Sequence, residues 1–551
     1  MRRPLFSAGA PLIGSRPHGG RRLSGPPLLA GGVLISALVW LLLAWQSLWQ
    51  GGVTWDEMLD FEGLNGAFWH GLNGLKGAHP DLTTITYDLE WFGNATRWPT
   101  YLLWRLLMII PWERITTLSR TQTLLVSGYF SLNHLNAMVF ALGGIGLTAA
   151  LAWQLAGRRA GIFAGALLLL LPTWLGHGWM NSKDIPMATS YLLYTLGTTL
   201  LLRGRRGGAV SRLVGIGLMS GSRVGSLVFL ALSEGVLLAP GGRRTPRRWL
   251  GSLAGGLLLG FLLTPQAWGD PLGYPLAAMR FISQRQGTGD SPGALRYIAS
   301  NLFDLLPSPL LLGLALLLVT TVLGRRASGH GLPPVLLALP TLLQLLIPPT
   351  LLIVGGKSIY NELRHLLMIQ PPLCVLAGLG YARATRLAGQ APGTGPASRL
   401  LIRSLLSLAG VATAVLLLEL LLLSPYHYTY RSDLARLLGG PSAPALRQDY
   451  WGFSGRETLS RCLRQPACAA PFAQRPLMVD HQSFNPDLIE ATATLLRPAP
   501  PQGPGGELLI STDPRTLATR EPLAATRRVT LLPQPRRSTL SAIVTAAGDA
   551  P

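Results

Sequence analysis

Long apolar runs separated by short polar segments make up most of the chain between residues 28 and 423. The first run, 28–49, is long enough as a helix to cross a bilayer core of about 30 Å. The run 209–238 is too long for one span, and the polar residues 220–223 (SGSR) interrupt it, so we expect two short spans there. The other runs lie at 132–157, 160–180, 187–202, 249–264, 303–323, 334–354, 365–382 and 400–423. The pattern predicts an α-helical polytopic membrane protein with about eleven transmembrane helices.

Composition agrees with this class. The 551 residues are 48% hydrophobic and 13% charged, whereas an ordinary soluble domain is about 25% charged. The net charge of +22 comes mainly from arginine in short loops, and such loops face the cytoplasm under the positive-inside rule. The excess charge therefore orients the spans and contacts anionic lipid, and we expect no nucleic-acid partner. The arginine-rich segments are the tail 1–27 and the loops at 158–159, 203–206, 243–248, 325–326 and 383–399.

The alternate segments then face the outer side of the membrane. They are 50–131, 181–186, the break at Arg223, 265–302, 355–364 and everything after about residue 424. This orientation predicts three parts, namely a cytoplasmic basic tail (1–27), a transmembrane domain (28–423) and an outer domain (424–551). The first outer loop, 50–131, is too long to be a simple connection without secondary structure. Its segment 101–111 (YLLWRLLMIIP) predicts an interfacial helix, anchored at the headgroups by tryptophans. These are Trp91, Trp98, Trp104 and Trp112.

The outer domain is polar and rich in proline. Residues 477–479 (LMV) and 508–510 (LLI) predict short strands, and 487–496 predicts a helix, so we expect a small α/β domain whose end is partly flexible. In an oxidising compartment Cys462 and Cys468 are candidates for a short-loop disulfide, with two free thiols as the alternative. Cys374, inside a span, is expected to be an ordinary buried residue.

Ionisable residues gather at the outer ends of the spans, where a charge is costly unless water or protein surrounds it. Carboxylates, cations and a histidine at one face of a bundle make a site that can hold a phosphate and move a proton. For Arg223, a side chain that reaches to the interface explains the sequence equally well. The candidates are Asp56 and Glu57 after the first span, Lys183 and Asp184 after the third, Arg223 at the break, and Arg364 and His365 before 365–382.

Several of these residues lie in motifs that resemble a bacterial branch of the GT-C glycosyltransferases, which is related to protein O-mannosyltransferases and lipid-A aminoarabinose transferases. The motifs are Asp56-Glu57 after the first span, 177–186 (HGWMNSKDIP), 360–365 (YNELRH), 425–430 (PYHYTY) and 449–452 (DYWG). The resemblance covers roughly residues 28 to 465. Ser182 stands where the branch usually has proline, and Asn361-Glu362 where it has Asp-Gly, but the charged positions are intact.

The resemblance implies a GT-C fold and the transfer of a sugar from a polyprenyl-phosphate carrier to an acceptor at the outer face, with inversion. It implies that Asp56 is the base and that Glu57 supports it or positions the acceptor. The leaving phosphate would meet cations that neutralise its growing charge. These are Lys183, Arg223 and Arg364, with His365 adding a hydrogen bond or packing against the headgroups.

The role of Asp184 stays open between two alternatives. It pairs with Asp56 around a divalent metal ion, or it forms an internal ion pair that fixes Lys183. The acceptor, a protein, lipid or glycan, also stays open. We expect a bacterial inner-membrane protein with its site on the periplasmic face.

The main alternative function is a transporter or flippase of polyprenyl-linked lipids, which is expected to show internal repeats and charges near the bilayer midplane. We see no repeat, and the charged cluster lies at one face. Glu234 and Glu419 lie inside apolar runs, and both are interpreted as structural because Glu234 faces the cytoplasmic end of its span and Glu419 has no evident partner.

Overall fold

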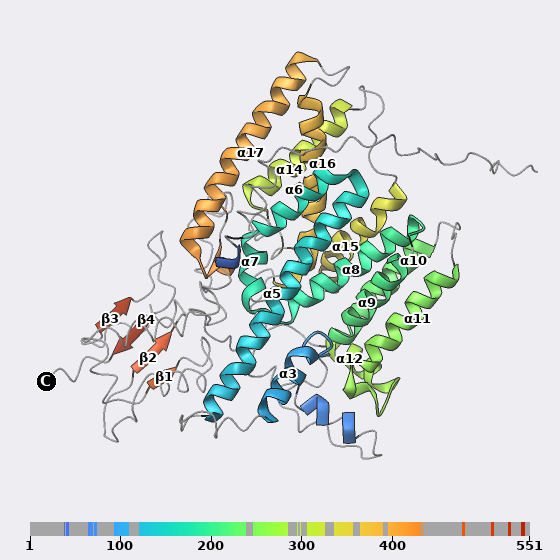
Figure 1. Cartoon of the computed structure of the whole chain (residues 1–551), viewed down its shortest axis with the longest axis vertical. Coiled ribbons are helices and arrows are strands. Elements are labelled where there is room, and N and C mark those ends of the chain that lie inside the picture. The colour runs from blue at the N-terminus through green and yellow to red at the C-terminus, as the bar shows by residue number, and fades with distance from the viewer. Residues whose placement is uncertain are drawn as a thin grey trace, which may run out of the picture.

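The structure is a computed structural model, and it consists mainly of a helical bundle with a small β-sheet beside it (Figure 1). It describes residues 93–109, 121–205, 207–238, 246–284, 306–324, 335–355, 364–389 and 395–430, with short stretches before residue 74, the isolated residues 295, 298 and 432, and four strands after residue 476.

The helices follow the predicted apolar runs. In chain order they are α3 (Trp98–Ile109), α5 (Thr121–Ala156), α6 (Arg158–Leu169), α7 (Pro172–Met180), α8 (Asp184–Leu202), α9 (Gly207–Ser222), α10 (Ser226–Leu238), α11 (Pro246–Leu262), α12 (Gly273–Gln284), α14 (Ser308–Gly324), α15 (Val335–Val354), α16 (Gln370–Ala388) and α17 (Pro396–Leu423). Three short 3-10 helices join them, η3 (Pro265–Ala267), η5 (Arg364–Ile369) and η6 (His427–Thr429). The predicted break in 209–238 is confirmed, because α9 ends at Ser222 and α10 begins at Ser226.

Five helical stretches in the described part of the chain are long and apolar enough to cross a membrane. They are Leu132–Ala156, Asp184–Leu202, Val335–Val354, Arg364–Ala388 and Pro396–Leu423. The bent pair of α6 and α7 makes a sixth if it counts as one span. Helices α9, α10, α11 and α14 are shorter than the roughly 20 residues that a full span needs. The chain is a multi-pass membrane protein, and the count of eleven spans stays a prediction.

The bend between α6 and α7 has a local cause. The two helices meet at 64°, and Pro172 is the first residue of α7. The residue before a proline is driven away from helical geometry, and Leu171 accordingly has an extended backbone with φ −75° and ψ 113°. The bend sends α7 into the bundle, where nearly all of its residues are buried, His177 and Trp179 among them.

Glycines let the central helices approach closely. A Cβ at Gly197 of α8 would come within 2.4 Å of the backbone nitrogen of Arg212 in α9, and one at Gly215 of α9 within 2.4 Å of the nitrogen of Tyr194 in α8. Small residues of this kind allow backbone-to-backbone packing in membranes. Helices α8 and α9 are therefore in direct contact along much of their length.

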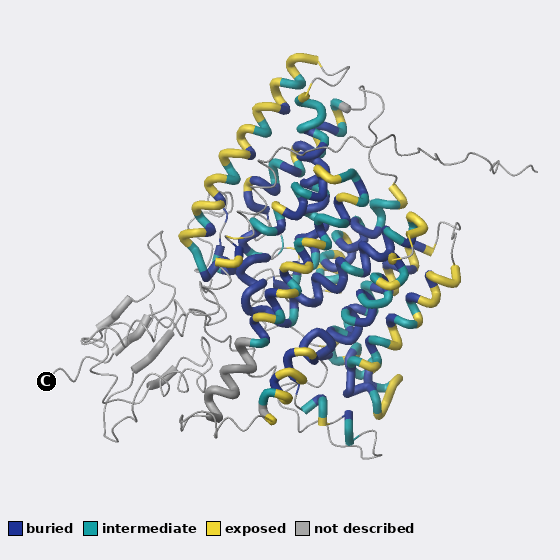
Figure 2. Tube along the Cα trace, viewed as in Figure 1, coloured by how far each residue is buried: buried dark blue, intermediate teal, exposed yellow. Residues whose placement is uncertain are grey.

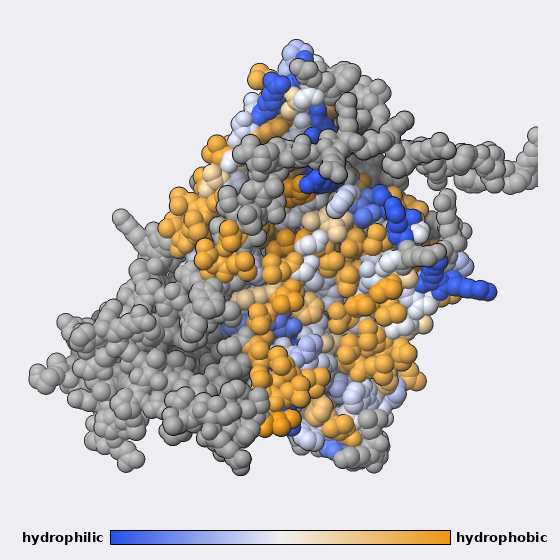
Figure 3. Space-filling view, in the orientation of Figure 1, coloured by the Kyte–Doolittle hydropathy of each residue, from blue (hydrophilic) through white to orange (hydrophobic). Residues whose placement is uncertain are grey.

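The outer surface of the bundle is apolar. Figure 2 shows that the central helices are mostly buried, while one side of α17 is exposed along its length. The exposed residues of α17 include Leu418, Leu421 and Leu422, which suits contact with lipid chains. In Figure 3 the hydrophobic surface forms a broad band over the visible helices, and hydrophilic surface gathers toward the upper ends of the helices.

The described part of the first outer loop corrects one prediction. Helix α3 covers most of the predicted interfacial segment, but Trp98 and Trp104 are buried inside the protein rather than placed as headgroup anchors. They pack with Tyr101 and Leu64, and the Trp98 indole donates a hydrogen bond to the carbonyl oxygen of Leu263, 2.8 Å away. Protein contacts bury these rings because α3 packs against α5 and the end of α11. Trp91 and Trp112 lie outside the described residues.

A four-stranded sheet lies in the C-terminal part, with strand order β1-β2-β4-β3. Strands β1 (Leu477–Val479) and β2 (Leu508–Ser511) are parallel, whereas β4 (Ala542–Thr545) runs antiparallel to both β2 and β3 (Arg527–Thr530). The two predicted strands are therefore present. The predicted helix 487–496 and the Cys462–Cys468 pair lie outside the described residues, so the limits and full content of this domain stay predictions. Cys374 is a buried free cysteine in α16.

Candidate functional site

The link between α7 and α8 is organised by Asn181. Its side-chain oxygen accepts hydrogen bonds from the backbone N–H groups of Lys183 and Asp184, at 3.2 and 2.8 Å. Its amide nitrogen donates to the carboxylate of Asp184 at 3.0 Å. Asparagine is favoured at helix starts because its side chain satisfies backbone N–H groups that lack a helical partner. Asn181 thus bonds to the backbone directly before and at the first residue of α8, and it orients the Asp184 side chain at the same time.

Asp184 forms an ion pair with Arg223, which lies between α9 and α10. The Asp184 side chain is 7% exposed and that of Arg223 is 29% exposed. Of the two predicted roles, the ion pair was expected to fix Lys183, whereas the partner of Asp184 in the structure is Arg223. Arg223 points toward the bundle rather than only to the membrane interface, because it reaches a buried carboxylate.

Arg364 and His365 approach the same carboxylate from η5. Both side chains act electrostatically on Asp184, and Arg364 also acts on His177 of α7. The Arg364 residue is buried. Two side-chain amides hold this segment in place: Gln344 of α15 donates to the carbonyl oxygen of Met368 at 2.9 Å, and Gln370 donates to the hydroxyl of Thr173 at 2.6 Å.

The four predicted phosphate-binding residues are therefore brought together at one end of α8. Lys183 is half-buried directly before Asp184, Arg223 pairs with Asp184, and Arg364 and His365 face it from η5. Arg223 and Arg364 act on the one carboxylate of this group, and Lys183 precedes that carboxylate in the chain. A group with several cationic side chains suits an anionic ligand such as a phosphate. We call Lys183, Asp184, Arg223, Arg364 and His365 the anion cluster.

The first outer loop reaches this cluster, which the sequence did not predict. The backbone N–H of Ala95 donates to the carbonyl oxygen of Gly221 at 3.1 Å, and the hydroxyl of Ser222 donates to that of Thr96 at 3.4 Å. A Cβ at Gly93 would fall 2.1 Å from the same Gly221 oxygen. The loop therefore packs on the two residues before Arg223. Asp56 and Glu57 of the same loop lie outside the described residues.

The described neighbours of Asp184 do not suit a metal ion. A divalent cation is held by several carboxylate or imidazole groups, and no group of three or more such side chains that could hold a metal occurs among the described residues. The Asp184 carboxylate instead accepts hydrogen bonds from Asn181 and Arg223. The pairing of Asp184 with Asp56 around a metal involves a residue outside the described part.

The segment that follows α17 packs against α7. The indole N–H of Trp179 donates to Nδ1 of His427 at 3.2 Å, and Nε2 of His427 donates to the carbonyl oxygen of Leu420 at 2.9 Å. Burial lowers the pKa of His427 to about 4, against an opposing effect of backbone hydrogen bonds. Gly176 is required at this contact, because a Cβ there would overlap the backbone nitrogen of Tyr428 at 2.0 Å. The motif 425–430 thus holds the helix that leads to Asn181 and Lys183.

A second buried ion pair joins Arg212 of α9 to Glu234 of α10, at 2.6 Å. Glu234 also accepts hydrogen bonds from the hydroxyl of Tyr194 (2.6 Å) and the indole of Trp249 (2.8 Å). Arg212 donates to the carbonyl oxygen of Trp249 at 2.8 Å and to the Ser252 hydroxyl at 2.5 Å. The structural role expected for Glu234 agrees with these contacts. The sequence pattern did not predict that Arg212 is its partner, although an arginine inside an apolar run is a visible signal of a buried partner.

No protein-family model matches the chain, and no curated protein matches it in sequence. Several solved structures are similar to it, among them two structures of a single protein. One is ArnT from Cupriavidus metallidurans bound to undecaprenyl phosphate, with 16% identity, a TM-score of 0.45 and coverage of 95% of this chain and 100% of that chain. The other is ArnT from the same organism in the apo state, with 17% identity and the same TM-score and coverage. At this level of similarity the side chains of the site, rather than the likeness, must decide the function.

Proposed function

We propose that this chain is a membrane glycosyltransferase that moves a sugar from a polyprenyl-phosphate donor to an acceptor at the outer face of a bacterial inner membrane. The observation that supports the proposal is the anion cluster at one end of an apolar helix bundle, in which Arg223 pairs with Asp184, Arg364 acts on the same carboxylate and Lys183 precedes it in the chain. A lipid-linked phosphate matches both features, because its chain suits the apolar helix surface and its head group suits the cations.

The chemistry required of the cluster is charge stabilisation on the leaving group. As the bond between the anomeric carbon and the phosphate oxygen breaks, its electron pair and negative charge stay with the lipid phosphate. Cations already held in place lower the energy of that charge without rearranging during the reaction. The Asp184 carboxylate holds Arg223 in this way, and arginine presents a fork of donors that fits two phosphate oxygens.

In this proposal Asp56 is the base, and Glu57 supports it or positions the acceptor. The acceptor oxygen attacks the anomeric carbon opposite the phosphate, Asp56 takes the hydroxyl proton, and the configuration inverts. General-base catalysis of this kind contributes about 10²–10⁴-fold to the rate. The contact of residues 93–96 with the α9–α10 break supports the proposal, because it brings the loop that carries Asp56 beside Arg223.

The test is donor consumption by purified protein. A panel of radiolabelled polyprenyl-phosphate sugars is incubated with the wild type, Asp56→Asn, Lys183→Ala and the control Arg403→Gln. The exposed Arg403 side chain of α17 donates hydrogen bonds to the carbonyl oxygen of Ala388. We expect one donor to be consumed by the wild type and the control. Asp56→Asn should be slower by about 10²-fold or more. Equal consumption by all four proteins would refute the assigned site.

A transporter of polyprenyl-linked lipids is the second candidate, and the Arg212–Glu234 pair is the observation that favours it, since it places charges inside the membrane part. The side chains of this pair are 0% and 7% exposed, and they neutralise each other. A transporter would move the labelled lipid across vesicles without releasing the sugar, so the same labelled donors distinguish the two functions.

A further inference from the structure

The Arg212–Glu234 pair lies between the helices that form the anion cluster, at a distance from it. Arg212 and Arg223 are separated by about three turns of α9, and Tyr194 and Asp184 by about three turns of α8, which corresponds to roughly 15 Å along each helix. Glu234 lies a similar distance from Arg223 along α10. The Asp184–Arg223 pair joins α8 to the link between α9 and α10, and about three turns away the Arg212–Glu234 pair joins α9 to α10, with Tyr194 of α8 bonded to Glu234.

The packing between α8 and α9 combines close backbone contacts with apolar side chains. Gly197, Gly208 and Gly215 meet the backbone of the facing helix, and Tyr191 and Tyr194 of α8 pack in one cluster with Ile216 and Met219 of α9. Between α9 and α11, the side chain of Leu259 lies over Gly217 and that of Ile216 over Gly256. Apolar contacts are non-directional, whereas a polar contact requires two particular groups to meet.

A buried ion pair is suited to fixing a register. It adds little net stability, because desolvation of both groups offsets their attraction, but it penalises every arrangement in which the two groups do not meet. The Arg212–Glu234 pair belongs to a network that joins several helices. Glu234 accepts hydrogen bonds from Tyr194 of α8 and Trp249 of α11, and it forms an ion pair with Arg212 of α9. The Arg212 guanidinium also lies 4.5 Å from the centre of the Trp249 ring.

We propose that Arg212 and Glu234 are positioning residues for the anion cluster. Their pairing holds α8, α9 and α10 at the heights at which Arg223 meets Asp184. Neither residue touches the ligand; both act through the helices that end at the cluster. This inference rests on the proposed function, because its ligand is the lipid phosphate named there. The hydrogen–deuterium exchange measurement below needs no ligand.

Four variants separate positioning from simple stability. Arg212→Met and Glu234→Gln each leave one buried charge without its partner. The double variant Arg212→Met/Glu234→Gln removes both charges and keeps an acceptor for Tyr194 or Trp249. The matched control is Tyr191→Phe, which removes an uncharged contact of 3.4 Å between the Tyr191 hydroxyl and Ser233, joining the same helices α8 and α10.

Three properties of each protein are measured in detergent: the melting temperature, the Kd for undecaprenyl phosphate, and the hydrogen–deuterium exchange of peptides covering 219–227. The exchange arm reports directly on the link that carries Arg223, where the N–H of Arg223 bonds to Met219 and that of Ser226 bonds to Arg223. Peptides from α16 serve as an internal reference.

We expect each single variant to lower the melting temperature, to weaken binding by about tenfold or more, and to speed exchange in 219–227 but not in α16. The double variant should regain the melting temperature, because no unpaired charge stays buried, yet keep the weak binding and the fast exchange. Tyr191→Phe should resemble the wild type in all three.

A double variant with wild-type binding and wild-type exchange would overturn the inference, since the pair would then serve stability alone. Exchange that changes equally in Tyr191→Phe would overturn it as well. If the wild type itself does not bind undecaprenyl phosphate, the proposed function fails, while the exchange of 219–227 still decides whether the pair positions Arg223.

Discussion

At the scale of single residues, the sequence did not predict that Asp184 pairs with Arg223. The positive-inside rule predicts that Lys183, Arg223 and Arg364 lie on the same side of the membrane, and in the structure Arg223 and Arg364 both act on Asp184. The partner of Asp184 depends on how α8 and α9 are rotated about their axes, which local sequence does not determine. Arg223 lies 39 positions away in the chain and became its partner through packing.

Arg212 shows a different kind of limit. Its cost inside an apolar run is visible in the sequence, but the groups that compensate it come from three other helices: Glu234, Tyr194 and Trp249. Hydropathy counts it against a span, whereas the fold gives it an ion pair with Glu234 and hydrogen bonds to Trp249 and Ser252. Asp56 and Glu57 stay predictions, because they lie outside the described residues.

His427 gives a prediction of pH dependence. Its pKa falls to about 4 in the folded protein because of burial, compared with roughly 6.5 for an unperturbed histidine. The unfolded chain therefore binds more protons between these values, so this contribution to the free energy of unfolding is complete above about pH 6.5 and is lost as the pH falls toward 4. We expect the melting temperature in detergent to drop between pH 7 and pH 5.

The matched variant for this prediction is His427→Gln, which keeps polar atoms near Trp179 and Leu420 but does not titrate. It should be less stable than the wild type at pH 7 and should show a shallower fall toward pH 5. An unchanged slope would assign the acid sensitivity to other groups.

At the scale of elements, hydropathy located most helices and the α9–α10 break. It did not predict features that depend on packing between helices. The bend between α6 and α7 was signalled by Pro172 but lies inside one continuous apolar run. The tryptophans of α3 were expected at the headgroups because aromatic rings favour that level. Contacts with α5 and α11 bury them instead, and no local pattern distinguishes the two environments.

The glycine contacts of α8 and α9 predict which substitutions the bundle tolerates. Gly197→Ala places a Cβ 2.4 Å from the Arg212 backbone, so the helices must separate. Overpacking of this kind costs about 1–3 kcal/mol, and we expect a clear fall in melting temperature. Gly146→Ala in α5, where a Cβ meets no atom within 4 Å, is the control and should be neutral or slightly stabilising. Equal effects would show that α8 and α9 do not pack this closely.

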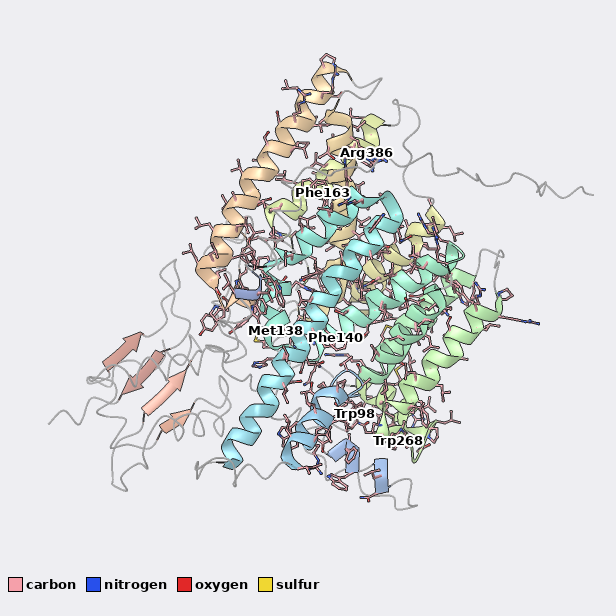
Figure 4. All side chains as sticks on the ribbon, viewed as in Figure 1. Trp98, Met138, Phe140, Phe163, Trp268 and Arg386 are labelled. Carbon is pink, nitrogen blue, oxygen red and sulfur yellow. The ribbon has the colours of Figure 1, made fainter. Side chains whose placement is uncertain are left out.

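At the scale of the whole molecule, charge separates the two ends of the bundle. Helix α8 begins at Asp184 in the anion cluster and ends at Leu202, directly before the arginine-rich loop 203–206, and α10 runs from beside Arg223 to Leu238 before the loop 243–248. Figure 4 shows Arg386 at the same end of the bundle as the start of α17, far from Trp98 and Trp268 at the opposite end. This polarity fits a site that faces one side of the membrane.

The central claim is that the anion cluster binds the phosphate of a polyprenyl lipid. Binding of undecaprenyl phosphate is compared with that of undecaprenol, which has the same chain without the phosphate, for the wild type, Arg223→Met/Arg364→Met and the control Arg403→Gln. Hydrogen bonds to charged groups contribute about 1.5–3 kcal/mol each. We therefore predict that the wild type and the control prefer the phosphate form strongly and that the double variant loses this preference. An undiminished preference in the double variant would contradict the account.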